Sequence, residues 1–186
     1  MNLQIDRAFA RVVVDQIEDY IQSEVLFWPV GNVGGLQLPQ LTIGAWLETE
    51  WRLAALEPDS AELAAARTAV RKYRSHAAEP YNNKAQREFK SRLDSWTLYL
   101  DETLERVINQ EAIAAELRPG YHANVRHRFK LELLKDHVPQ VQVQVQRLNM
   151  LDMRLRSRFK DGDFIWEPEL RNAAPKDPFW WLWGGL

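Results

Sequence analysis

The sequence predicts an all-α protein, a single-domain bundle of five to seven helices over residues 1–186. An irregular, aromatic-rich C-terminal segment, residues 161–186, is expected to pack across that bundle. Three observations predict this class. Apolar side chains recur every three or four residues over most of the chain. Glycine and proline gather between those stretches. Four of the eight tryptophans stand in the last 21 residues, so much apolar area there must be covered.

The first expected helix covers about residues 2–27, where Ile5, Phe9, Val13 and Ile17 share one stripe. The valine run at 12–14 is strand-like alone, but the longer period favours a helix. A loop rich in glycine and proline follows over residues 30–40. Thr42 is then a suitable N-cap for a second helix over 43–56.

The third expected helix starts at Asp59, as N-cap with Glu62 three residues on, and runs to about residue 78. Pro80 should separate it from the longest helix, which Asn82 or Asn83 would cap and which holds its apolar stripe through residue 108. The Arg-Pro-Gly sequence at 118–120 is expected to end that region, and a fifth helix follows over about 121–137.

The sixth expected helix begins near Pro139. Residues 141–145 alternate valine and glutamine, a strand signal, but Val141, Leu148 and Leu155 continue a helical stripe through the same residues. We therefore predict a helix. Beyond Lys160 the pattern stops, with a turn expected at Asp161-Gly-Asp163 and an extended piece at 164–166.

Most kinds of reactive site lack support in the sequence. Cysteine is absent, which excludes thiolate chemistry and Cys-ligated metals. The four histidines form no ligand pair at a spacing of four, and no serine stands in a nucleophile elbow. The loop at 31–35 lacks the lysine of a phosphate-binding loop. No catalytic, metal or cofactor residue is predicted, and an enzyme is the less favoured class.

The sequence also lacks the features of a secreted or membrane-spanning protein. The first residues show no basic stretch leading into an apolar run, so no signal peptide is expected. Charges interrupt every apolar stretch before the roughly 18 residues that a membrane-spanning helix needs. We therefore expect a cytoplasmic protein without a membrane partner.

Charge is unevenly distributed although its sum is only −2. Residues 1–62 hold three Lys and Arg against ten Asp and Glu, whereas residues 63–160 hold 19 against 11. The basic faces of residues 67–92 and 147–160 form the basis of one alternative function, nucleic-acid binding, because such stripes can follow phosphates. Its candidate contacts are Arg67, Arg71, Arg74, Arg87, Arg147, Arg154 and Arg158.

The leading hypothesis is a non-enzymatic interaction or adaptor protein that binds another protein or itself. Long amphipathic helices and the Trp-rich C-terminus motivate it. Trp180, Trp181 and Trp183 are candidate partner contacts, because tryptophan is enriched at interface hot spots. For the same rings, an intramolecular strap that fills grooves between helices is favoured over a docking surface. A third hypothesis is an enzyme with a pocket lined by Trp46, Trp51, Tyr121 and His122.

Overall fold

A computed structural model of the protein describes residues 2–108, 114–138 and 142–186. It confirms the all-α class: helices dominate the described residues, and the strands form only two small antiparallel pairs. The chain divides into two compact units, residues 1–89 with 133–139 and residues 90–132 with 140–186. The single-domain interpretation stays a prediction. Among the described helices, none is long and apolar enough to span a bilayer.

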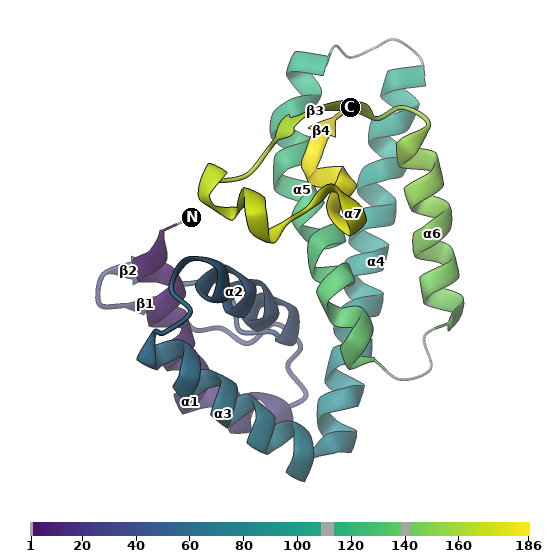
Figure 1. Ribbon diagram of the computed structural model, residues 1–186. Coiled ribbons are helices and arrows are strands. Elements are labelled where there is room, and N and C mark those ends of the chain that lie inside the picture. Colours follow the sequence, from purple (N-terminus) through teal and green to yellow (C-terminus); the bar gives the residue numbers. More distant parts are fainter. Residues whose placement is uncertain (1, 109–113, 139–141) are drawn as a thin grey trace. The chain divides into compact units, whose positions relative to one another are not determined.

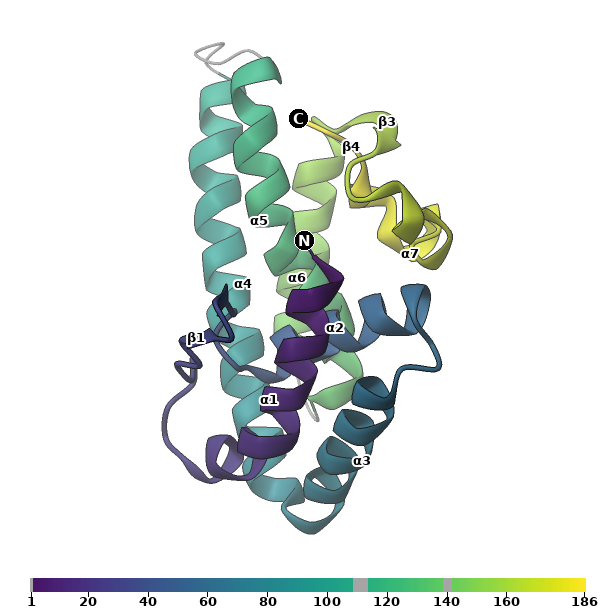
Figure 2. The same cartoon turned by 90° about the vertical axis from the view of Figure 1, so that its left-hand side faces the viewer.

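Unit 1 is built around α1 (Leu3–Gln22), which packs against α2 (Ile43–Leu56) and α3 (Ala61–His76) (Figure 2). Its apolar stripe is buried as predicted, with Phe9, Val13 and Ile17 at most 1% exposed. The predicted loop contains a short hairpin, β1 (Asn32–Val33) paired with β2 (Leu36–Gln37). Gly34 and Gly35 make its turn with positive φ, which glycine adopts without strain.

Two helix starts in unit 1 depend on hydroxyl caps. Thr42 Oγ1 accepts a hydrogen bond from the backbone N–H of Ala45 at 3.0 Å, which confirms the predicted start of α2. The predicted cap of α3 is wrong by one residue. Ser60 caps that helix, accepting from the N–H of Leu63 at 3.1 Å. Both residues suit an N-cap, and only the folded backbone selects between Asp59 and Ser60.

The predictions at two prolines are wrong. Helix α4 (Ala78–Ile108) starts before Pro80, so Asn82 and Asn83 lie inside it and do not cap it. Proline is tolerated in a first turn, where the missing N–H would have no helical partner. Helix α5 (Ala114–Leu134) likewise continues through Pro119. The flanking Leu117 and Tyr121 are both buried, and that packing outweighs the loss of one backbone bond.

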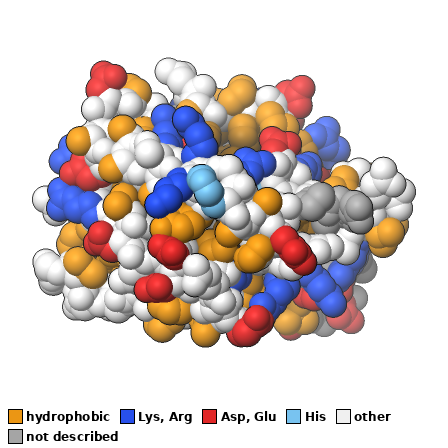
Figure 3. Space-filling model, turned by 90° about the horizontal axis from the view of Figure 1, so that it is seen from below, with side chains coloured by type: hydrophobic (Ala, Val, Ile, Leu, Met, Phe, Trp, Pro, Cys, Tyr) orange, Lys and Arg blue, Asp and Glu red, His pale blue; other side chains and the backbone are white. Residues whose placement is uncertain are grey.

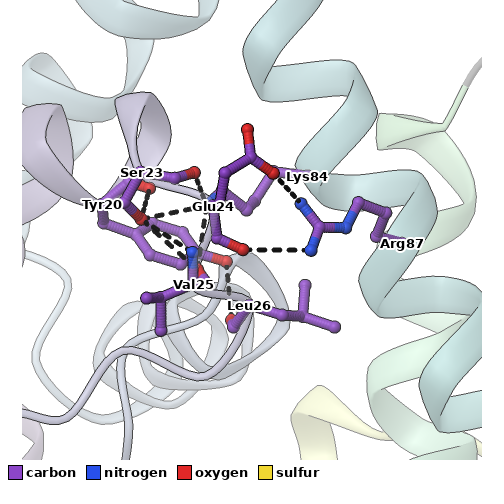
Figure 4. Close-up of polar contacts among 7 residues, drawn as sticks. All are labelled: Tyr20, Ser23, Glu24, Val25, Leu26, Lys84 and Arg87. Atoms are coloured by element: carbon purple, nitrogen blue, oxygen red, sulfur yellow. Dashed lines mark hydrogen bonds and ion pairs between the residues drawn. The ribbon is translucent and has the colours of Figure 1, made fainter.

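Helix α1 ends earlier than predicted, at Gln22, because α4 binds the carbonyls that follow it (Figure 4). Lys84 Nζ donates to the carbonyl oxygens of Ser23 at 2.6 Å and Val25 at 2.9 Å. The ammonium also lies 4.6 Å from the centroid of the Tyr20 ring. One buried cation therefore satisfies two backbone carbonyls of the segment that follows α1.

Unit 2 contains the remainder of α4, most of α5, and α6 (Gln142–Arg156), which run side by side in Figure 1. The helical interpretation of the alternating segment is confirmed from Gln142 onward, whereas Pro139 and Val141 lie outside the described residues. Leu148, Leu151 and Leu155 form the buried stripe of α6. The fifth helix also ends close to its predicted position, since a 3-10 turn, η1 (Lys135–His137), follows α5.

The C-terminal segment is more regular than predicted. Strand β3 (Lys160–Phe164) includes Asp161, Gly162 and Asp163, so these residues do not form the expected turn. It pairs antiparallel with β4 (Trp183–Gly185). Between the strands lie three short helices, η2 (Pro168–Ala173), α7 (Lys176–Phe179) and η3 (Trp180–Leu182). Gly184 permits the pairing, because a Cβ there would stand 2.0 Å from the carbonyl oxygen of Lys160.

Candidate interaction surface

Three of the four tryptophans of the C-terminal segment pack against α5 and the residues around the end of α6, within unit 2. Trp181 is 1% exposed, and its carbonyl oxygen accepts a hydrogen bond from the Tyr121 hydroxyl at 2.7 Å. The Trp180 ring meets Phe159 edge to face at 5.1 Å between centroids. Trp166 meets Phe129 in the same way at 4.7 Å. The predicted packing of this segment across helices is therefore confirmed within the unit.

Basic side chains cover the outer surfaces of these rings. The Arg156 guanidinium lies 4.2 Å from the Trp180 ring centroid, and that of Arg171 lies 4.9 Å from the Trp183 centroid. Such cation–π contacts are worth about 0.5–1 kcal/mol each at exposed sites. Trp180 and Trp183 keep part of their surface exposed, whereas Trp181 is inaccessible. Partner contact through Trp180 and Trp183 stays a prediction.

Five of the seven arginines suggested for nucleic-acid binding already contact protein groups. Arg67, Arg87, Arg147 and Arg154 form ion pairs with Glu50, Glu24, Asp94 and Asp101, and Arg74 donates to the carbonyl of Asp136. Arg71 and Arg158 are exposed. In Figure 3, basic and acidic side chains are interspersed on the face shown and do not gather into one basic field. Nucleic-acid binding stays a prediction.

A different surface stands out by its exposure. The four most exposed large apolar side chains of the described residues all lie on α4 and α6 of unit 2. Leu98 is 60% exposed, Val143 75%, Met150 55% and Met153 67%. Single exposed apolar side chains are ordinary, but neighbouring ones mark contact surfaces. We name this set, with the ion pairs Asp94–Arg147 and Asp101–Arg154 beside it, the α4/α6 face.

The two ion pairs determine how the apolar side chains of this face are aligned. Both pairs are 2.7 Å long and join α4 to α6 seven residues apart on each helix. On α4, Leu98 lies four residues after Asp94 and three before Asp101. On α6, Met150 lies three residues after Arg147 and four before Arg154. Leu98 and Met150 therefore stand at one level between the two pairs, because side chains three or four apart share a helix face.

The four residues of the predicted enzyme pocket are divided between the units. In unit 2, Tyr121 and His122 line a pocket of about 410 Å³ together with Arg118 and strands β3 and β4. In unit 1, Trp46 lines a smaller pocket of about 260 Å³, formed by α2, α3 and η1. Trp51 lines neither. Burial and the nearby Arg118 lower the pKa of His122, so its ring is neutral at pH 7.

Groups that could hold a metal ion are absent from the described residues, where no three His, Asp or Glu side chains come together. The pocket of unit 2 mixes cations and carboxylates and presents no aligned nucleophile and base. The α4/α6 face is therefore the surface whose composition points most directly to a function. Searches against protein-family models, curated proteins and solved structures found no match for the chain.

Sequence reasoning missed this face although a signal was present. The stripe that predicts α6 runs through Leu148, Leu151 and Leu155, and it leaves Val143, Met150 and Met153 outside it. A helix buries only one stripe, so a second apolar set on its other side is left exposed.

Proposed function

We propose that the protein is a non-enzymatic interaction protein that associates with a second copy of itself through the α4/α6 face. The observation that carries the proposal is that the four most exposed large apolar side chains of the described residues all lie on α4 and α6. Covering them would remove apolar area from water, which is the main driving force of association. The proposal keeps the cytoplasmic location expected from the sequence, which cell fractionation tests.

A second copy suits this face because the face is charge-balanced. It carries two arginines and two aspartates, and each of these side chains is 41–51% exposed. The acids lie on α4 and the bases on α6, with the same seven-residue spacing. A two-fold axis that runs parallel to α4 and α6, between them, would place the acids of one copy opposite the bases of the other. Self-complementary patches of this kind are typical of two-fold dimers.

The expected association is weak. Four apolar side chains form a small contact area compared with about 800 Å² per partner in standard interfaces. We therefore expect a dissociation constant on the order of 10 μM to 1 mM. At low concentration the monomer would dominate, and dimers would appear as the concentration rises.

Sedimentation velocity across a concentration series tests the proposal. The double variant Val143→Gln with Met150→Gln removes apolar area from exposed helix positions without adding charge. Val14→Gln, at an apolar side chain that is 39% exposed on α1, is the matched control. We expect the double variant to weaken dimerisation at least about tenfold and the control to change it less than about twofold.

Three results would contradict the proposal. The first is a monomer throughout, up to about 1 mM. The second is a dimer that the double variant leaves unchanged. The third is a dimer that Trp180→Ala abolishes while the double variant does not, which would place the contact on the C-terminal tryptophans.

A further inference from the structure

We infer that the smaller pocket of unit 1 is a binding site for a small phosphate-bearing anion. Arg67, Arg71 and Arg74 stand at intervals of four and three along α3, and all three line this pocket of about 260 Å³. Glu50 is the one carboxylate among the lining residues, and it pairs with Arg67 at 2.7 Å. Two guanidinium charges therefore remain without a carboxylate in the lining.

The two remaining arginines differ in how they are held. Arg74 donates from Nη2 to the carbonyl oxygen of Asp136 at 3.2 Å, and its guanidinium lies 5.9 Å from the Tyr81 ring centroid. These contacts place it before any ligand arrives, which lowers the entropy cost of binding. Arg71 is exposed and forms no ion pair or side-chain hydrogen bond with the described residues. It is the arginine available to close on an anion.

The lining also supplies a neutral nitrogen. His137 Nδ1 lies 2.9 Å from the Tyr81 hydroxyl, which leaves Nε2 as the ring nitrogen for a ligand. Burial and the charge of Arg74 lower the pKa of His137 to about 4, against the smaller opposing effect of Asp136. The ring is therefore uncharged at pH 7. When the hydroxyl donates to Nδ1, Nε2 carries the hydrogen and can donate to an oxygen of the anion.

The shape and floor of the pocket indicate the size of the ligand. Trp46, Leu47 and Val70 are each at most 8% exposed, and they form an apolar wall beside the charged groups. An apolar wall lowers the local dielectric constant and strengthens the attraction between guanidinium and phosphate. The volume is just under the range of about 300–1,000 Å³ typical for drug-sized ligands. A phosphate monoester with a small organic group fits better than a nucleotide polymer.

Phosphate is the favoured chemistry because arginine presents a planar fork of donors that matches its oxygens. Arg71 and Arg74 would share the negative charge, and Nε2 of His137 would add one neutral donor. The site is independent of the proposed self-association, since all of its residues belong to unit 1 and the α4/α6 face belongs to unit 2.

Titration calorimetry with inorganic phosphate and with phenyl phosphate, at constant ionic strength against chloride, tests the inference. Arg71→Gln removes a guanidinium that holds no protein partner among the described residues, so the fold should remain intact. Lys72→Gln removes the same charge from an adjacent residue outside the lining. We expect Arg71→Gln to weaken phosphate binding at least about tenfold and Lys72→Gln less than about twofold.

Thermal unfolding in chloride checks that both variants are folded. Binding of phenyl phosphate at least as tight as that of inorganic phosphate would support the role of the apolar wall. Absence of binding up to about 10 mM phosphate would overturn the inference. Equal losses in the two variants, for phosphate or for a single-stranded oligonucleotide, would also overturn it, because they indicate a diffuse basic surface.

Discussion

The guanidinium carbon of Arg128 lies 3.6 Å from the centroid of the Trp181 ring, and both side chains are almost completely buried. The same guanidinium donates to both carboxylate oxygens of Asp152 at 2.8 Å and to Glu132 at 2.9 Å. One cation on α5 thus joins the C-terminal segment to α6. Its burial is tolerated because its charge is paired and each of its three nitrogens donates a hydrogen bond.

Replacing Arg128 should therefore destabilise unit 2 strongly. Arg128→Met keeps much of the side-chain volume but leaves Asp152 without its bidentate partner. We expect the free energy of unfolding to fall by about 3 kcal/mol or more, measured by urea denaturation. Arg154→Met is the control, since its ion pair with Asp101 is half exposed and worth at most about 1 kcal/mol. Equal losses in the two variants would contradict this account.

Removing residues 175–186 should show whether the C-terminal segment is an intramolecular strap or a docking surface for a partner. The deletion takes away Trp181, Leu182 and strand β4, all of which pack within unit 2. We expect the truncated protein to lose the near-ultraviolet circular dichroism of its packed aromatic rings and part of its helix content. A truncated chain that stays folded and changes only its mass in light scattering would instead identify the segment as a contact surface.

The buried pair of Asp6 and Arg52 in unit 1 should be sensitive to the loss of either partner. Arg52 Nε donates to Asp6 Oδ2 at 3.0 Å, and both side chains are at most 2% exposed. Burial raises the pKa of Asp6, and this effect is larger than the opposing effect of Arg52. Asp6→Leu should reduce the free energy of unfolding by about 3–5 kcal/mol, because Arg52 keeps its charge without this carboxylate.

The double variant Asp6→Leu with Arg52→Met is the informative comparison. Replacing both partners by apolar groups removes both charges of the pair, so we expect it to recover part of that loss. A double variant as unstable as the single one would show that shape, and not charge, controls this site. Chemical denaturation at pH 7 measures all three proteins under the same conditions.

Acid should destabilise unit 2 through His127. Burial, together with the charges of Arg92 and Lys130, lowers the pKa of His127 from 6.5 to about 4. Between pH 6.5 and about pH 4, this histidine is protonated in the unfolded chain but neutral in the folded chain. A falling pH therefore favours the unfolded chain and lowers the free energy of unfolding across that window. His127→Gln should remove about 1 kcal/mol of this loss between pH 7.5 and 5, after discounting for solvent screening.

The measurement is the unfolding free energy of each protein at the two pH values. His76→Gln is the control, because His76 is exposed and its Nδ1 lies 2.7 Å from the backbone carbonyl oxygen of Lys72. A parent protein and a His127 variant that lose equal stability on acidification would contradict the prediction.

The candidate surfaces were only partly visible in the sequence. The pattern of α6 identified Leu148 and Leu155 as buried and left Met150 outside the stripe, but the alignment of Met150 with α4 depends on ion pairs that only the folded chain forms. The three arginines of α3 form a basic stripe that the sequence pattern shows. Their convergence with His137 on one pocket depends on residues more than 60 positions apart, which no local pattern connects.

By itself, the sequence determined where helices form, since a 3.6-residue repeat of apolar side chains is a local property that Phe9 in α1 and Leu148 in α6 both follow. It also determined that the tryptophan-rich end must be covered. Tertiary structure decided the rest. Helix α4 begins before Pro80 because a first turn tolerates proline, and α5 continues through Pro119 because burial of neighbouring residues outweighs local propensity. Trp181 is buried against the guanidinium of Arg128, and two carboxylates compensate for the burial of that charge. Such pairing between residues far apart in the sequence exists only in the folded chain.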